Sequence, residues 1–111
     1  MSFQPFDVVV VPFPYSERLS EKRRPALVVS HPDLPDTLGR VWVTMITSAE
    51  TSQIGDAVIA DLQQAGLPVA SILRASKIAT LDSDRILRVT GRLSPKDRET
   101  AKAALRACAA F

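Results

Sequence analysis

The chain has 111 residues, the size of one ordinary domain, and we expect residues 1–111 to form a single domain. Its 46% hydrophobic and 23% charged residues exclude a wholly disordered chain, and the length allows a buried core without a metal or a disulfide. The net charge of +2 and the pI of about 9.0 form a mild basic excess, which allows an anionic partner but does not require one.

The single cysteine and the N-terminus indicate the compartment. Cys108 has no second cysteine with which to form an intrachain disulfide, which fits a reducing environment. The N-terminus lacks the basic region of a signal peptide, and no apolar run approaches the roughly 20 residues of a membrane span. We therefore expect a cytoplasmic protein that has no membrane partner.

The first third of the chain predicts two strands separated by a loop. Residues 8–11 are a continuous β-branched run, which is typical of a buried strand. Residues 15–23 are polar and charged without apolar periodicity and predict an exposed loop. Residues 26–30 predict a second strand that starts after Pro25, because proline cannot donate to a strand ladder. Residues 31–36 have the composition of a turn.

The middle of the chain predicts further short strands at residues 41–47, 57–60, 69–73, 77–81 and 86–93. A break at residues 74–76 separates the third of these from the fourth, and Gly91 is a candidate β-bulge in the last. Strand alternation over residues 41–47 places one set of side chains on one face and a second set on the other. The first set is Val41, Val43, Met45 and Thr47, and the second is Trp42, Thr44 and Ile46.

The C-terminal segment predicts a helix over residues 95–109. Ser94 is a candidate N-cap, Pro95 occupies the first helical position and Asp97 lies three residues after the cap. Apolar residues then recur at helical spacing and predict a buried face, which consists of Ala101, Ala104, Leu105 and Cys108. Many short strands followed by one helix predict a mainly β fold, a small bent β-barrel with a packed C-terminal helix.

Several kinds of site are excluded by residue content. His31 is the only histidine and Cys108 the only cysteine, and neither lies in a cluster of metal ligands. The four glycines stand apart, so there is no glycine-rich phosphate loop, and no Gly-x-Ser-x-Gly motif is present. His31, between Ser30 and Pro32, is interpreted as a surface turn residue. We therefore expect no metal ion and no cofactor.

What remains is a set of arginines and hydroxyls at predicted strand ends. Arg24 lies where the charged loop enters a strand, Arg74 at the end of another, and Thr47 and Ser48 at the end of a third. If a barrel brought these ends together, the site would suit a phosphate, because guanidinium and hydroxyl groups donate hydrogen bonds to it. Cleavage of RNA by its own 2'-hydroxyl needs little more, and one such donor can supply about 3–4 kcal/mol. Arginines that are merely solvated at the surface remain the alternative.

The sequence resembles the MazF/PemK-like toxins of type II toxin–antitoxin systems, and most closely their PemK-like branch. The resemblance is carried, in order along the chain, by FDVVVVPFPY at residues 6–15, KRRPALVVS at 22–30, VTMITS at 43–48, LRASKI at 73–78 and VTGRLS at 89–94. It covers nearly the whole chain. It implies an SH3-like β-barrel with a C-terminal helix, usually a homodimer.

The resemblance also implies an activity and partners. Such toxins are metal-independent, sequence-selective endoribonucleases that cleave single-stranded RNA, including mRNA, and leave a 2',3'-cyclic phosphate and a 5'-hydroxyl. They inhibit growth until a cognate antitoxin covers the RNA groove with a flexible tail. Operator DNA is expected as a partner only through the complex with the antitoxin.

The family's functional residues match particular positions of this sequence. Arg24 matches the catalytic arginine of the Arg-Pro segment, which stabilises charge in the transition state, and Thr47 matches the threonine that holds the scissile phosphate. Arg74 matches an arginine that some members use near the scissile bond. The neighbouring residues that we expect to contact RNA are Ser48, Lys22, Arg23, Ser76 and Lys77.

Two positions depart from the family pattern. Some members have an aspartate, proposed as the general base, where this chain has Ser76, and many have glycine where this chain has Phe6. Glu17 and Glu21 are alternative bases in the loop before Arg24, and we choose Glu21 as the nearer one in sequence. Both could equally be solvated loop carboxylates.

Other interpretations stay open at this point. Because of Ser76, the chain could be a non-catalytic barrel that binds RNA or an antitoxin without cleavage, or a barrel with no nucleic acid ligand. Trp42 is interpreted as a core or dimer-interface residue in preference to a platform for RNA bases. Leu105 and Phe111 fit core packing and a dimer contact equally well.

Overall fold

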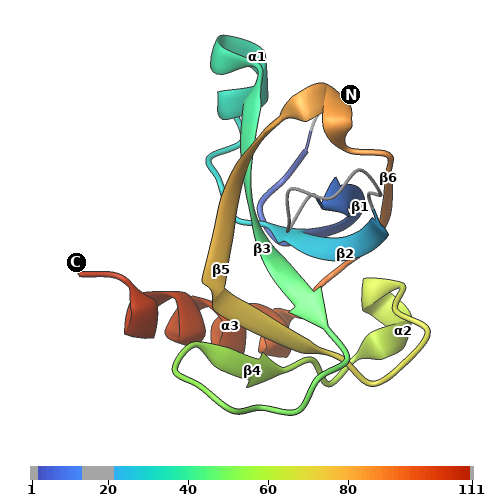
Figure 1. Ribbon diagram of the computed structural model, residues 1–111, viewed down its shortest axis with the longest axis vertical. Helices are drawn as coiled ribbons and strands as arrows, with labels where there is room; N and C mark the ends of the chain where they lie inside the picture. Colours follow the sequence, from blue (N-terminus) through green and yellow to red (C-terminus); the bar gives the residue numbers. More distant parts are fainter. Residues whose placement is uncertain (1–2, 14–21, 111) are drawn as a thin grey trace.

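The computed structural model describes residues 3–13 and 22–110, and Figure 1 shows a strongly bent sheet with a helix packed beneath it. In this part of the chain six strands form one antiparallel sheet in the order β4-β5-β3-β2-β1-β6. The strands are β1 (Asp7–Phe13), β2 (Lys22–Val28), β3 (Arg40–Thr47), β4 (Asp56–Val58), β5 (Ile72–Asp82) and β6 (Arg88–Arg92). The helices are α1 (Leu34–Leu38), α2 (Leu62–Ala65), α3 (Pro95–Cys108) and the 3-10 turn η1 (Ser83–Arg85). The mainly β half-barrel with a C-terminal helix confirms the predicted fold class.

The two faces of the sheet bury two separate sets of apolar side chains. On one face Val8, Leu27 and Ile46 pack with Ala101 and Ala104 of α3. The other face forms a second core, which the sheet encloses by its own bend, from Val9, Val11, Ala26, Val28, Val41, Val43, Ile86 and Phe3. Because strand side chains alternate, the β-branched runs of the sequence supply both cores at once.

Helix α3 forms as the capping residues predict. The Ser94 side chain accepts a hydrogen bond from the backbone N–H of Asp97 at 3.1 Å, and Pro95 occupies the first turn. The prediction that Cys108 faces the core is wrong, because Cys108 is exposed. The helix buries Ala101 and Ala104 in its middle, and its last turn runs out beyond the sheet, as Figure 1 shows.

Asp97 also joins α3 to the segment that leads into α2. Its side chain is 3% exposed, and its two oxygens accept hydrogen bonds from the backbone N–H groups of Ala60 at 3.0 Å and Asp61 at 2.9 Å. A buried carboxylate is stable only when its oxygens are satisfied in this way. Asp97 therefore fastens the helix to the chain between β4 and α2.

Some predicted strand limits differ from those observed. Strand β2 begins at Lys22, so Lys22 and Arg23, expected in a loop, are part of a strand that ends at Val28 and not at residue 30. The segments 69–73 and 77–81, expected as two strands, form the single strand β5, which begins only at Ile72. The residues between Arg74 and Ile78 nevertheless have no partner in β3, so a bulge lies close to the predicted break.

The last strand contains a bulge, at Thr90 and not at the predicted Gly91, and is shorter than expected. Strand β6 covers Arg88–Arg92 within the predicted range of 86–93. Its partners in β1 change register between Val8 and Val9, which pair with Gly91 and Val89 and leave Thr90 between them. Thr90 Oγ1 donates to backbone oxygens of Val8 and Ala65, which brings α2 against β6.

Two one-turn helices were not predicted. The turn expected at residues 31–36 contains the start of α1, which ends at Gly39 with a φ of 66°. Helix α2 begins at Asp61, whose side chain accepts from the N–H of Gln64, and ends at Gly66 with a φ of 71°. Both glycines adopt the left-handed conformation that ends a helix with little strain. None of the described helices is long and apolar enough to cross a membrane.

Phe6 adopts an unusual backbone conformation just before β1. Its φ is 71°, in the left-handed region, where a non-glycine residue costs about 1–3 kcal/mol. The ring packs against the core beneath the sheet, and the Lys102 ammonium lies 5.8 Å from the ring centroid. These two contacts of the ring offset the strain at Phe6.

Candidate functional site

Arg24, Thr47 and Arg74 lie on the same face of the sheet, opposite the face that α3 covers. The register pairs Ala26 of β2 with Met45 of β3, and Met45 with Arg74 of β5. Continued for two residues, the β2–β3 register sets Arg24 opposite Thr47. Because cross-strand partners share a face, the arginine–threonine row lies about 6.8 Å along the strands from the row that contains Arg74.

Arg24 reaches this site from the inner face of β2. It pairs with Val11 of β1, which belongs to the second core, so its side chain starts among apolar groups. Its Nε atom is buried and makes no hydrogen bond to the residues that the structure describes. A buried N–H of a guanidinium without an acceptor is costly and has its best partner in an anionic oxygen.

Thr47 ends β3 and offers a hydroxyl on the sheet face that also carries Arg24. Its Oγ1 accepts a hydrogen bond from the backbone N–H of Ala49 at 3.3 Å, which orients the side chain at the strand end. The hydroxyl proton is left to donate elsewhere. Ser48 follows as an exposed residue, at the start of the loop that leads to β4.

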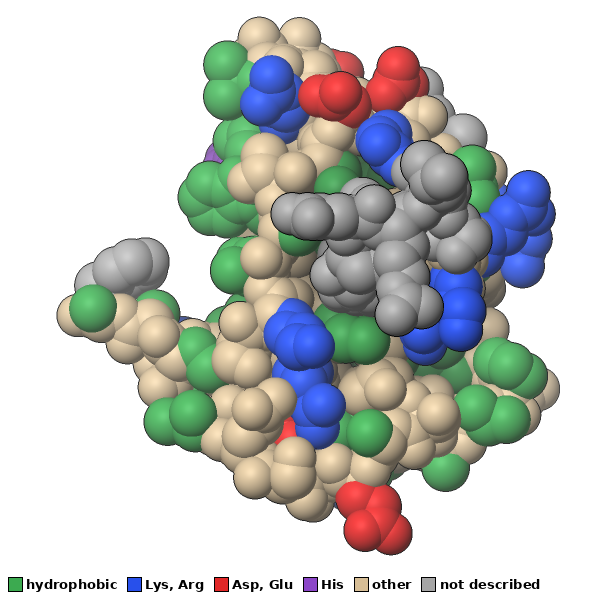
Figure 2. Space-filling model, in the orientation of Figure 1, with side chains coloured by type: hydrophobic (Ala, Val, Ile, Leu, Met, Phe, Trp, Pro, Cys, Tyr) green, Lys and Arg blue, Asp and Glu red, His purple; other side chains and the backbone are tan. Residues whose placement is uncertain are grey.

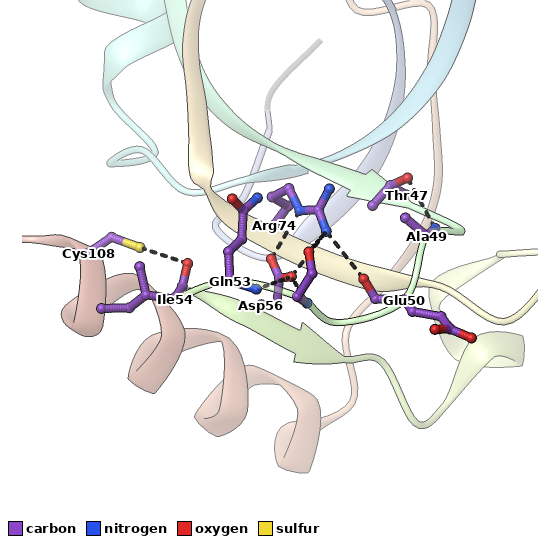
Figure 3. A network of polar contacts seen from close by, with 9 residues as sticks. Thr47, Ala49, Glu50, Gln53, Ile54, Asp56, Arg74 and Cys108 are labelled. Atoms are coloured by element: carbon purple, nitrogen blue, oxygen red, sulfur yellow. Dashed lines mark hydrogen bonds and ion pairs between the residues drawn. The ribbon is translucent and has the colours of Figure 1, made fainter.

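Arg74 is held in a two-pronged ion pair with Asp56 of the neighbouring strand β4, as Figure 3 shows. Its Nε donates to Oδ1 and its Nη2 to Oδ2, each at 3.0 Å, and only 13% of the arginine side chain and 1% of the aspartate side chain are exposed. The same Nη2 also lies 3.3 Å from the backbone oxygen of Glu50 and from the Ser52 hydroxyl. The ion pair thus uses Nε and Nη2 of the guanidinium, and Nη1 makes no hydrogen bond to the described residues.

The carboxylate of Asp56 has four N–H donors. Besides Arg74, the backbone N–H groups of Ser52 and Gln53 donate to Oδ2 at 2.8 Å and 3.2 Å. The hydrogen bond from Arg74 is the main cause that lowers the pKa of Asp56 to about 2, with the backbone donors adding to it and burial opposing it. Asp56 is therefore a charged anchor for the loop between β3 and β4.

Asp56 was missed at the level of sequence. It is 18 residues from Arg74, and no local spacing rule joins two residues at that distance. Its one sequence signal is the pair Gly55-Asp56 immediately before a short β-branched stretch. Gly55 has a φ of 87°, and this turn brings Asp56 to the start of β4.

The other predicted residues are distributed around these three. Lys22 and Arg23 are exposed on β2, and Ser76 and Lys77 are exposed in the bulge of β5. Figure 2 shows Lys and Arg side chains gathered in two places on this face, over the lower half of β5 and near β2 and β6. Glu17 and Glu21, the two predicted alternative bases, lie outside the described residues. The site therefore combines arginines and hydroxyls, in keeping with the predicted phosphate chemistry.

Two further predictions concern single side chains. His31 is exposed and its Nδ1 accepts from the backbone N–H of Asp33 at 3.1 Å, which confirms it as a surface turn residue. Trp42 is 46% exposed, so its interpretation as a core residue is wrong. Within residues 3–13 and 22–110 no group of three His, Cys, Asp or Glu side chains could hold a metal ion.

Comparison with known proteins was made for both sequence and fold. Among curated proteins no match was found. The fold resembles an endoribonuclease from a mycobacterial species solved in complex with its cognate antitoxin, with a TM-score of 0.76, 17% identity and coverage of 94% of this chain and 91% of that one. It also resembles MazF from Deinococcus radiodurans, with a TM-score of 0.74, 19% identity and coverage of 95% of this chain and 94% of that one. A third similar structure is Mycobacterium tuberculosis toxin MazF-mt6, with a TM-score of 0.73, 18% identity and coverage of 89% of this chain and 91% of that one.

The sequence itself provides the family assignment. Residues 4–108 match the family described as PemK-like, MazF-like toxin of type II toxin-antitoxin system. The match includes every strand and all of α3, and with them Arg24, Thr47 and Arg74. The chain therefore belongs to the PemK-like, MazF-like toxin family.

Proposed function

We propose that this protein is the toxin of a type II toxin–antitoxin pair and acts as a metal-independent, sequence-selective endoribonuclease on single-stranded RNA. The observation that carries the proposal is the unsatisfied, buried Nε of Arg24 on the same sheet face as Thr47 and Arg74. A phosphate oxygen supplies the missing acceptor. Because the site is partly buried, such a hydrogen bond is stronger than it would be in water.

The reaction follows from these groups. The 2'-oxygen of the RNA attacks the adjacent phosphorus and loses its proton to a base, while the bond from phosphorus to the 5'-oxygen breaks and that oxygen gains a proton from solvent water. Arg24 stabilises the added negative charge on the phosphorane, and Thr47 donates its hydroxyl proton to a non-bridging oxygen. The products are a 2',3'-cyclic phosphate and a 5'-hydroxyl.

The proton acceptor that we assign is Glu21. Asp56 is unsuited to this role, because both of its oxygens are occupied by N–H donors and its pKa is about 2. Ser76 has no carboxylate. We assign RNA contacts outside the reacting centre to Lys22, Arg23, Ser48, Ser76 and Lys77.

The test is cleavage of a single-stranded RNA by purified protein in excess EDTA, with analysis of the new ends. We expect a 2',3'-cyclic phosphate and a 5'-hydroxyl at a restricted set of sequences. Cleavage that stops in EDTA, or a 5'-phosphate end, would contradict the proposed mechanism. RNA that stays intact but shifts on a gel would favour a non-catalytic RNA-binding module.

We propose that the toxin is a cytoplasmic homodimer and that the apolar surface around Trp42 forms the interface. Trp42 and Ile78 are 46% and 55% exposed. They border a cavity of about 420 Å³ that is lined by Val29, Trp42, Ala75, Ile78, Leu105, Arg106, Cys108 and Ala109. Exposed apolar surfaces of this kind are typical of protein interfaces, and tryptophan often contributes most of the binding energy.

Trp42→Glu is expected to convert the dimer to a monomer. A buried tryptophan at an interface contributes about 2 kcal/mol or more, so the dimer dissociation constant should rise at least about 30-fold. Sedimentation velocity over a concentration series measures this dissociation constant. Leu38→Glu, at a 67% exposed apolar residue of α1, is the matched control and should leave the constant unchanged. A dimer that survives Trp42→Glu would place the interface elsewhere.

The cognate antitoxin is the second proposed partner. The solved relative from a mycobacterial species was crystallised with its cognate antitoxin, which supports the same kind of complex here. We propose that a flexible antitoxin tail covers the RNA groove and that operator DNA is contacted only through this complex.

A further inference from the structure

The ion pair between Asp56 and Arg74 differs in kind from the pair of Arg40 with Asp82 at the other end of β3 and β5. Arg40 and Asp82 also face each other across two strands, but their side chains are 56% and 63% exposed and share one contact at 3.0 Å. In contrast, Asp56 is 1% exposed and makes two contacts with the guanidinium. An ion pair with two parallel hydrogen bonds, from Nε and Nη2, fixes the plane of the guanidinium as well as its position.

We propose that Asp56 is a positioning residue for RNA cleavage, which holds Arg74 so that Nη1 is presented to the scissile phosphate beside Thr47. The proposal rests on the ribonuclease function proposed above. It assigns Asp56 no contact with the substrate. Asp56 acts through Arg74, by taking up Nε and Nη2 and leaving Nη1 as the free donor.

Backbone hydrogen bonds around Asp56 fix the position of its carboxylate. The N–H groups of Ser52 and Gln53 hold Oδ2, and the backbone oxygen of Glu50 and the Ser52 hydroxyl approach the guanidinium from the same loop. Strand β4 is only three residues long and lies at the edge of the sheet. The loop that begins at Ser48 is thus tied to β5 through this pair and through the hydrogen bond that the Ala75 N–H donates to the Gly55 oxygen at 3.0 Å, which couples the position of Arg74 to the end of β3.

The opposite charges of Asp56 and Arg74 predict that loss of Asp56 affects RNA binding and the rate of cleavage in different ways. Asp56 neutralises Arg74, so its removal would make the site more positive and strengthen its general attraction for RNA. The same removal frees Arg74 to rotate, and misplacement of a catalytic group by about 1 Å costs about 10²-fold in rate. A residue that serves only folding would instead lower the amount of active protein without separating these two quantities.

The test compares Asp56→Asn with wild-type protein in steady-state cleavage of one RNA. We expect kcat to fall about 10- to 100-fold while KM stays constant or decreases. In an Arg74→Ala background Asp56→Asn should have no further effect on kcat, since its action passes through Arg74. Asp82→Asn removes the cross-strand pair with Arg40 at the far end of the same two strands and should leave kcat unchanged.

The outcomes separate this inference from the proposed function. A wild-type protein that cleaves no RNA would refute the proposed function and the positioning role of Asp56 with it. If the wild type cleaves and Asp56→Asn has the same kcat, or lowers kcat equally with and without Arg74, only the positioning role is refuted.

A second variant covers the case in which Asp56→Asn does not fold. Arg74→Lys keeps the positive charge but cannot form the planar fork with Asp56. We expect it to lose kcat to the same extent as Asp56→Asn with little change in KM. A wild-type kcat for Arg74→Lys would show that charge alone suffices and would overturn the proposal.

Discussion

Arg24→Ala is expected to lower the rate of RNA cleavage by about 10²- to 10³-fold, the loss measured when one preorganised donor is removed from a transition state. The reason is the position of its guanidinium on the inner face of β2, with a buried Nε that has no acceptor among the described residues. The negative charge of the phosphorane provides one. Single-turnover cleavage with saturating protein measures the chemical step directly.

The same substitution is expected to leave stability unchanged or slightly higher. In the folded chain the buried Nε loses its hydration without gaining a hydrogen bond, and alanine removes that penalty. Thermal unfolding of both proteins measures this. Arg40→Ala, at an exposed pair with Asp82, is the matched control and should cleave at the wild-type rate. Wild-type cleavage by Arg24→Ala would overturn its assignment as the catalytic arginine.

Asp97→Ala is expected to destabilise the fold by about 2–4 kcal/mol, the cost of losing two charge-assisted hydrogen bonds and leaving their donors unsatisfied. Asp97 is 3% exposed and accepts from the N–H groups of Ala60 and Asp61. Without it, α3 loses its polar attachment to the segment between β4 and α2. Urea unfolding at equilibrium, with the slope checked for constancy, measures the change.

Asp61→Ala is the matched control for that experiment. The Asp61 side chain caps only the one-turn helix α2 through the N–H of Gln64, at 3.0 Å, and its removal should cost about 1 kcal/mol. An equal effect of the two substitutions would mean that the two hydrogen bonds of Asp97 stabilise the fold no more than a single cap does. In that case the link between α3 and the sheet would depend on apolar packing.

The parts of the fold that sequence predicts well are those dictated by local patterns. The β-branched run of β1, the alternation in β3 and the capped helix α3 are each specified by residues that are neighbours in the chain. Arg24 and Thr47 were identified through their family resemblance, and the β2–β3 register places them on one face. That register depends on pairing between distant segments, which no single segment reveals.

The remaining features were missed because they depend on contacts between distant residues. The bulge in β5 looks like a strand break along the chain, since three residues there have no partners in β3. Cys108 fits the periodicity of α3, but the helix runs beyond the sheet there, so Cys108 stays exposed and its thiol lies 3.9 Å from the backbone oxygen of Ile54. Asp56 acquires its role only when β4 pairs with β5 and brings it to Arg74.

The division of the sheet into two faces has a consequence for how such a protein can change over time. Residues that pack between the sheet and α3, such as Leu27 and Ala104, lie behind the sheet, whereas the arginines and Thr47 lie in front of it. Substitutions behind the sheet alter mainly the lifetime of the folded protein. The second core lies in front and also stabilises the fold, but under the proposed function substitutions of the arginines and Thr47 alter mainly which RNA is cleaved and how fast. Under the proposed function the two traits can therefore diverge independently, so that a few substitutions at the site change the RNA sequence that is cleaved without endangering the fold.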